Sequence, residues 1–383
     1  MTSRERVKTA LRFEEPDKVP LATYAIDCDI ASKILGRHTY IRDKAGQMIA
    51  FWEGRRDEVV AGLIQDIPEL FQKLDIYDLI HLRKIAIVPP KGHHPPEPKQ
   101  IADGVWETAS GQTLKYSAIT NEIAAVSHKT NWDTEYTLEQ FPLDPEVGPE
   151  DESIYEVWDA VVDKLPPDRY IVGHYPMVRE QILLGGYERG LVEVAMHPEI
   201  IERAGASERA RVAKQRKLWK PRPTVTAFDG VMNENDFGHT TGSFVSPEAF
   251  RRLFLENVKF NSEAIHAEGW GFIQHSCGDN RPIFDQLVEG GIDLLQSLQP
   301  QAGMSPAMVK EQSGNRMAAW GGVDVANLVA GTMDDVRRDV RETMETAKAG
   351  GGLILGASHS IAWGTKYDNF MAMLDEFEKT RDY

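Results

Sequence analysis

Cysteine is scarce in this chain, which has only Cys28 and Cys277 among its 383 residues. Two cysteines cannot form the set of disulfides that stabilises small secreted domains, and such a low count is typical of a reducing compartment. Residues 1–13 are charged and lack the apolar core of an export signal. We therefore expect a cytoplasmic protein.

Long apolar runs and excess positive charge are also missing. No stretch of about 18 uncharged apolar residues occurs, so the sequence predicts no membrane-spanning helix. Acidic residues outnumber lysine and arginine by 59 to 43, which gives a formal net charge of −16. A surface of this sign argues against nucleic acid and anionic membranes as partners. The length is nevertheless sufficient to bury a large core.

Short apolar runs alternate with longer amphipathic segments along the chain. Eight runs have the length and the flanking glycine, proline or polar residues of β-strands. These runs are residues 19–25, 77–82, 170–176, 226–232, 271–277, 293–299, 317–323 and 352–358. Repeated strand–helix units indicate a parallel sheet, and eight of them predict a closed (β/α)8 barrel, the TIM-barrel fold. A doubly wound sheet could alternate in the same way.

The clearest helix signal covers residues 246–269. Ser246 can cap its start, Pro247 takes the first helical position, and Gly269 follows its end. The alternation is interrupted earlier in the chain. Residues 104–130 alternate around a Ser-Gly turn and predict a β-hairpin, and the proline-rich residues 88–100 predict an exposed connection. We expect one domain over residues 1–383, with an insertion at about 88–135.

Two potential metal ligands lie at the end of the fifth predicted strand. In such a barrel the reactive side chains lie at the carboxyl ends of the strands. His275 and Cys277 are two residues apart, so on a strand both would point to the same side. Imidazole and thiolate suit zinc, which commonly takes three protein ligands in catalytic sites. His359, after the eighth strand, is the candidate third ligand, although Cys277 could equally be a buried apolar residue.

Other side chains at strand ends complete the candidate site. Glu234 and Asp236 follow the fourth strand. They are candidates for a fourth metal ligand, or for groups that orient or protonate a leaving group, although they could equally cap a loop. The candidates for binding a substrate, chosen from their position at the ends of strands, are His174, Tyr175, Gln299 and Trp320.

A series of short motifs runs through the C-terminal third of the chain. The motifs are "HSCG" from residue 275, "QP" from 299, "WGGVD" from 320, "GT" from 331, "GGG" from 350 and "SH" from 358. In this order and spacing they resemble the uroporphyrinogen decarboxylase superfamily, and the opening "RFEEPDKVPL", residues 12–21, is similar to it too. The resemblance implies a (β/α)8 barrel, in agreement with the strand count.

The superfamily includes decarboxylases and methyltransferases. The decarboxylases bind a porphyrinogen that carries many carboxylates, and they share an arginine-rich motif near the N-terminus. Residues 23–37 of this chain contain no arginine cluster, and a polyanion without arginines to pair with it is physically implausible. The His-X-Cys pair instead resembles that of the cobalamin-dependent methyltransferases. This resemblance implies zinc at His275 and Cys277 and a corrinoid as the methyl acceptor.

The chain departs from one group of these methyltransferases. In the methylcobamide:coenzyme M enzymes, a glutamate and a late cysteine complete the zinc site. Near those positions this chain has Gln299 and the segment 358–360, Ser-His-Ser. A His-Cys-His site carries one negative charge fewer, so its metal is a better Lewis acid and a poorer activator of thiols.

The expected function is therefore a zinc-dependent methyltransferase of the kind found in O-demethylase systems. It would take a methyl group from a small methylated compound, such as a methoxylated aromatic ether. The acceptor would be the cobalt of a separate corrinoid protein, because the chain has no D-X-H-X-X-G segment for binding cobalamin. A decarboxylase or other lyase for a different small acid is the alternative, and a non-catalytic corrinoid or tetrapyrrole binder is a third. The sequence leaves open whether the protein is a homodimer.

Overall fold

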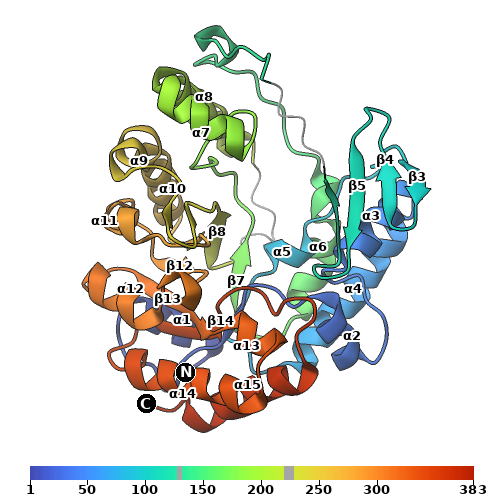
Figure 1. Cartoon of the computed structure of the whole chain (residues 1–383). Coiled ribbons are helices and arrows are strands. Elements are labelled where there is room, and N and C mark those ends of the chain that lie inside the picture. Colours follow the sequence, from blue (N-terminus) through green and yellow to red (C-terminus); the bar gives the residue numbers. More distant parts are fainter. Residues whose placement is uncertain (127–131, 220–227) are drawn as a thin grey trace.

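Eight parallel strands form the centre of the molecule in the computed structural model, which describes residues 1–126, 132–219 and 228–383 (Figure 1). The strands are β1 (Ala22–Thr23), β2 (Leu79–Ile80), β7 (Tyr170–Gly173), β8 (Gly230–Glu234), β11 (Gly271–His275), β12 (Leu294–Gln296), β13 (Ala318–Val323) and β14 (Leu353–Ala357). They are hydrogen-bonded in this order. A parallel bridge between Leu21 and Leu355 joins the first strand to the last. The predicted (β/α)8 barrel is confirmed.

All eight predicted runs overlap a strand, but most strands are shorter than predicted, and β8 extends two residues beyond the predicted end, to Glu234. The run 293–299, for example, contributes only Leu294–Gln296 to the sheet. Ser297 has a left-handed backbone with φ of 75°, so the chain leaves the sheet there. The residues released in this way form the mouth of the barrel. The first two residues of the predicted strand 226–232 lie outside the described part of the chain.

Helices surround the barrel (Figure 1). They are α1 (Ser3–Leu11), α2 (Cys28–Leu35), α3 (Lys44–Trp52), α4 (Arg56–Lys73), α5 (Arg83–Ala86), α6 (Glu156–Val161), α7 (Tyr187–Met196), α8 (Pro198–Leu218), α9 (Pro247–Leu253), α10 (Leu255–Ala267), α11 (Phe284–Glu289), α12 (Pro306–Ser313), α13 (Val325–Val329), α14 (Met333–Ala347) and α15 (Tyr367–Thr380). Among the described residues, no helix is long and apolar enough to cross a membrane.

The predicted helix 246–269 begins as expected but is interrupted. The Ser246 hydroxyl accepts the backbone N–H of Ala249 at 3.1 Å, and Pro247 is the first helical residue. Phe254 then leaves the helical conformation, with φ of −124°, and divides the segment into α9 and α10. Phe254 is fully buried. The pattern of apolar residues continues through Phe254, so the sequence did not predict the break between α9 and α10.

The predicted insertion contains a larger sheet than the expected hairpin. Four antiparallel strands, β3 (Lys99–Ala102), β4 (Val105–Glu107), β5 (Thr113–Ser117) and β6 (Glu122–Ala125), pair in sequence order. Gly111, with φ of 77°, lies in the turn between β4 and β5. Residues 127–130 of the predicted hairpin are outside the described residues. Trp106 of this sheet packs on Trp52 of α3, with ring centroids 5.6 Å apart. The single-domain assignment for residues 1–383 stays a prediction.

The inside of the barrel is filled rather than open. Val172, Met232, Ile273, Leu294 and Ile354 come from different strands and are all fully buried in one apolar cluster. A second cluster fills the space between the strands and the surrounding helices. A barrel packed in this way leaves its carboxyl-terminal mouth as the place where polar side chains can gather.

Candidate metal centre and adjoining pocket

The three predicted metal ligands meet at the mouth of the barrel. His275 ends β11, Cys277 follows it, and His359 follows β14. One ligand atom from each of the three lies within 4.8 Å of the other two. His275 Nε2 is 3.5 Å from Cys277 Sγ, and the two imidazole rings are 5.3 Å apart between centroids. Residues more than 80 positions apart therefore form one cluster of nitrogen and sulfur donors.

His275 is held in an orientation suitable for a ligand. Its Nδ1 forms a short hydrogen bond with Oε1 of Gln296, the last residue of the neighbouring strand β12. Because Oε1 can only accept, Nδ1 carries the proton and Nε2 presents its lone pair toward Cys277. The Tyr24 ring stacks on the imidazole, with centroids 4.6 Å apart and planes inclined by 21°. The hydrogen bond fixes the tautomer of His275, and the stacking contact helps to fix the position of its ring.

Cys277 is held by two other loops at the mouth. Its backbone N–H donates to Asp236 Oδ1 at 2.8 Å, and its sulfur is 3.2 Å from the Ser297 hydroxyl. Ser297 Oγ in turn donates to the carbonyl of Ser358 at 3.0 Å, next to His359. The loops after β8, β11, β12 and β14 are therefore connected around the cluster.

The protonation states of the cluster depend on burial. Burial, followed by the charge of Asp236, raises the pKa of Cys277 to about 12. Burial, followed by the neighbouring His275, lowers the pKa of His359 to about 4. In the metal-free protein at pH 7 the cysteine is therefore a thiol and the histidine is neutral. A cation bound here would release the thiol proton.

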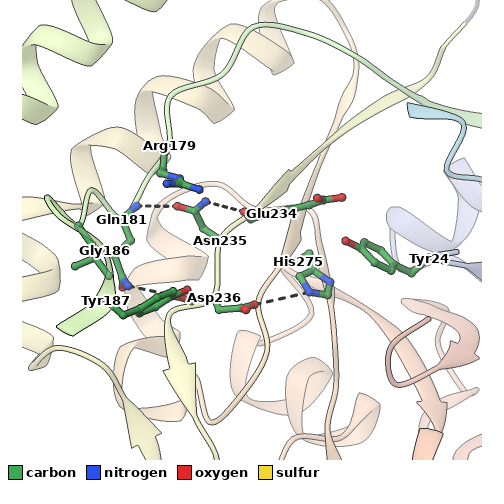
Figure 2. A pocket seen from close by; sticks show the side chains of 10 residues that line it. Tyr24, Arg179, Gln181, Gly186, Tyr187, Glu234, Asn235, Asp236 and His275 are labelled. Carbon is green, nitrogen blue, oxygen red and sulfur yellow. Dashed lines mark hydrogen bonds and ion pairs between the residues drawn. The ribbon is translucent and has the colours of Figure 1, made fainter. Parts of the chain in front are cut away.

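A pocket of about 280 Å³ adjoins the cluster (Figure 2). Most of its wall is polar, and its aromatic side chains come from loops on different sides. The lining residues are Tyr24, Arg179, Gln181, Leu183, Gly186, Tyr187, Glu234, Asn235, Asp236 and His275. Of the predicted site residues, the pocket therefore contains His275, Glu234 and Asp236.

Glu234 is the anionic member of a buried ion pair. Its Oε2 accepts the Lys84 ammonium at 2.7 Å, and Arg83 Nη1 is 3.8 Å from Oε1. Burial acts to raise the pKa of Glu234, but His81, Lys84 and Arg83 outweigh it and hold the pKa at about 2. His81 itself is neutral, because burial lowers its pKa to about 3. The cation that pairs with Glu234 is therefore Lys84.

Asp236 is more accessible and lies closer to the predicted ligands. Its side chain is 40% exposed, and Oδ1 is 3.7 Å from Nε2 of His275. Figure 2 shows its carboxylate directed at the His275 ring. Its assignment as a fourth ligand or as an orienting group stays a prediction, and its position beside the cluster is compatible with either role.

His174 and Tyr175 are close to the mouth but do not line the pocket. Nδ1 of His174 accepts the Nε–H of Arg83 at 3.3 Å, so it is one residue removed from Glu234. Tyr175 packs edge-on against Trp219 and Trp270, with centroid distances of 5.2 and 5.3 Å. This arrangement makes Tyr175 part of the packing between β7 and the surrounding helices.

Gln299 and Trp320 also lie away from the pocket wall. Gln299 Oε1 accepts the backbone N–H of Gly278 at 2.7 Å and thereby holds the turn after Cys277. Gly278 has φ of 81°, and a Cβ there would lie 2.4 Å from the carbonyl carbon of Gly238, so this turn requires glycine. Trp320 is fully buried inside the barrel. Trp320 lies inside β13, so its predicted position at the end of a strand is wrong, and its side chain packs inward instead of lying at the mouth.

Several pocket residues were absent from the sequence-based prediction. Tyr24 of the pocket, and Lys84 beside Glu234, follow the first two strands closely, so the ends of those strands could have predicted them. Arg179 and Gln181 belong to the long connection between β7 and α7, and Tyr187 is the first residue of α7. No pattern in the sequence indicates that this connection lies over the mouth of the barrel.

Comparisons with known proteins agree with the fold. Residues 230–380 match the family described as uroporphyrinogen decarboxylase (URO-D). A methyltransferase from Methanosarcina mazei has a similar structure over 99% of each chain, with a TM-score of 0.56 and 16% sequence identity. A B12-independent methionine synthase from Shewanella sp. W3-18-1, in complex with selenomethionine, aligns over 84% of this chain and 87% of its own, with a TM-score of 0.38 and 10% identity. No curated protein matches the chain.

At 16% identity the similarity to the Methanosarcina mazei methyltransferase concerns the fold alone. The family match is more specific, because it begins at β8 and includes all three residues of the donor cluster. Residues 230–380, from β8 to α15, are therefore similar to the uroporphyrinogen decarboxylase family.

Proposed function

We propose that the chain is a zinc-dependent methyltransferase that transfers a methyl group from a small methyl ether to the cobalt of a separate corrinoid protein. The observation that carries this proposal is the convergence of His275, Cys277 and His359 beside a polar pocket. The name of the Methanosarcina mazei neighbour, a methyltransferase, supports the same class of reaction.

The donor cluster is chemically suited to zinc. Three protein ligands of nitrogen and sulfur type leave a coordination position open, as in catalytic zinc sites. The hydrogen bond from His275 to Gln296 is the kind of outer contact that orients a metal-bound imidazole. One thiolate and two neutral imidazoles would leave a bound Zn²⁺ with a net charge of about +1. When bound, zinc supplies a Lewis acid for the oxygen that loses its methyl group.

The protein's own side chains position the substrate and orient the leaving oxygen. In the proposed reaction the carbon–oxygen bond breaks and both of its electrons stay on oxygen. The Co(I) of the partner's reduced corrinoid would supply the electron pair of the new cobalt–carbon bond and become Co(III). Glu234 is ionised and accepts hydrogen bonds from Lys84, so we assign it to positioning rather than to proton donation. Asp236, which faces the pocket beside His275, is the group we assign to orienting the leaving oxygen. The proton that completes the product alcohol comes from solvent.

The corrinoid partner would have to reach the mouth of the barrel. We propose that it docks over this face, between the β3–β6 sheet and α7, which flank the mouth (Figure 1). A chain with a net charge of −16 favours a partner with a basic face. Affinity capture with the immobilised protein, under anaerobic and reducing conditions, should recover a corrinoid protein. Capture of none from cells that grow on the methyl donor would contradict the docking step.

Metal analysis tests the central feature of the proposal. The purified protein should hold about one zinc per chain, and Cys277→Ser should lose it. Cys28→Ser is the matched control, because Cys28 is the other cysteine of the chain and lies outside the donor cluster. Retention of zinc in the Cys277→Ser protein would show that this cluster is not the zinc site.

An activity assay tests the reaction itself. The zinc-loaded protein is mixed with a reduced corrinoid protein and a series of methyl ethers, and formation of methylcobalamin is followed by its absorbance. Wild type and Cys28→Ser should transfer methyl groups, whereas Cys277→Ser should not. Decarboxylation of a small acid that survives Cys277→Ser would instead favour the lyase alternative.

A further inference from the structure

We propose that Arg179 binds a carboxylate group of the methyl donor, so that the substrate is an anionic methyl ether rather than a neutral one. This inference rests on the proposed function for the identity of the ligand as a methyl donor. The binding of the carboxylate can nevertheless be measured without any methyl transfer.

Arg179 differs from the other charged residues of the pocket because its side chain has no partner. Glu234 is paired with Lys84 at 2.7 Å, and Asp236 accepts the N–H of Cys277 at 2.8 Å. Within residues 1–126, 132–219 and 228–383, the Arg179 guanidinium makes no hydrogen bond or ion pair. The pocket therefore contains one positive charge that is available to a ligand.

The backbone on both sides of Arg179 is fixed by asparagine side chains. Asn261 Oδ1 accepts the N–H of Val178 at 2.9 Å, and Asn235 Oδ1 accepts the N–H of Gln181 at 3.0 Å. Val178 is fully buried. The guanidinium thus projects from a rigid segment although it is itself unpaired. An anion that binds it would not have to order the loop, which lowers the entropic cost of binding.

The position of Arg179 sets the orientation of a bound donor. Figure 2 shows Arg179 on the loop that crosses one side of the pocket, with His275 on the other side and Asn235 between them. A small donor with its ether oxygen at the metal cluster would direct its far end toward Arg179. Guanidinium forms two parallel hydrogen bonds to a carboxylate, a geometry that also selects the orientation.

The overall charge of the chain makes such a residue necessary for an anionic substrate. A net charge of −16 repels anions at long range. Glu234 and Asp236 add negative charge at the pocket wall itself. A carboxylate would enter only where a local cation outweighs these groups, and the unpaired Arg179 supplies that cation.

Calorimetric binding to the zinc-loaded protein tests the assignment with two matched probes, 4-methoxybenzoate and 4-methoxybenzamide. They have nearly the same shape and differ in charge. Wild type should bind the benzoate at least about tenfold more tightly than the amide. Arg179→Met should weaken benzoate binding by about 10- to 100-fold, the loss expected for a charge-assisted hydrogen-bonded pair, and should leave amide binding unchanged.

Arg12→Met is the control, because it removes the same charge from an exposed arginine outside the pocket, 57% accessible at its side chain. It should leave the affinities for both probes unchanged. Arg179→Lys, which keeps the charge but loses the paired hydrogen bonds, should fall between wild type and Arg179→Met. Equal affinity of wild type for the two probes, or unchanged benzoate binding in Arg179→Met, would overturn the assignment.

Different experimental results would contradict the proposed function and the assignment of Arg179. Carboxylate binding through Arg179 without transfer of any methyl group would preserve this inference and contradict the proposed function. Methyl transfer from the amide that is as efficient as transfer from the benzoate would support the proposed function and overturn this inference.

Discussion

Replacement of Glu180 by glutamine should remove a pH dependence from the stability of the fold. Glu180 lies between Arg179 and Gln181 in the pocket loop, and it is fully buried. Asn261 Nδ2 donates to its Oε1 at 3.3 Å, whereas Oε2 has no hydrogen-bond partner among the described residues. Burial raises the pKa of Glu180 from 4.5 to about 8. The carboxyl group is therefore protonated at pH 7 in the folded chain and ionised in the unfolded one.

The magnitude follows from the two pKa values. Between pH 4.5 and pH 8 the folded state binds one more proton than the unfolded state at this residue, so stability falls as pH rises. Each pH unit inside this window contributes about 1.4 kcal/mol. Integrated from pH 5 to pH 8, the contribution of Glu180 to the free energy of unfolding decreases by about 3 to 4 kcal/mol. Glutamine keeps the size and polarity of the side chain but cannot ionise.

Urea unfolding of wild type and Glu180→Gln at pH 5, 6, 7 and 8 measures this contribution. Other titrating groups affect both proteins alike, so the relevant quantity is the wild-type stability minus that of the variant. It should decrease by about 3 to 4 kcal/mol across the series. Glu263→Gln, at an exposed position of α10, should show no such trend. A difference that stays constant with pH, or increases, would refute the burial argument.

Three further predictions concern the metal centre and the barrel. Gln296→Met should lower zinc affinity by about 10- to 100-fold while the fold is retained, because His275 loses the acceptor that fixes its tautomer. Competition with a chromophoric chelator measures the zinc affinity. An unchanged affinity would contradict the role of Gln296. Removal of zinc from wild type by a chelator should lower the melting temperature, and zinc should restore it, whereas the Cys277→Ser protein should not respond. Trp320→Ala should destabilise the fold by about 3 to 5 kcal/mol in denaturant unfolding, because it leaves a cavity at the centre of the barrel. A strong loss of ligand binding with unchanged stability would instead indicate that Trp320 binds the substrate.

The donor cluster could be predicted because its signal is local. His275 and Cys277 are two residues apart, and the period of a strand predicts that both lie on one side, although β11 itself ends at His275. His359 follows the last strand, and closure of the barrel brings the ends of all strands to one face. Both inferences need only strand positions, which apolar runs bounded by glycine and polar residues define well.

The pocket wall could not be predicted because loops and rotamers form it. The path of the connection that carries Arg179 depends on hydrogen bonds to Asn261 and Asn235, which are distant in sequence. Trp320 and Glu234 were both predicted to lie near strand ends, yet Trp320 fills the barrel from within β13 and Glu234 pairs with Lys84. The register of each strand against its neighbours decides such orientations, and a single sequence does not encode that register locally.

The position of His359 has a consequence for how the protein is made. His275 and Cys277 leave the ribosome well before β14, the strand that closes the barrel through the Leu21–Leu355 bridge. A nascent chain that stops before β14 has two of the three donors and no closed sheet to hold them. Metal uptake would therefore follow the synthesis of β14 and His359, and chains truncated before β14 would remain without metal.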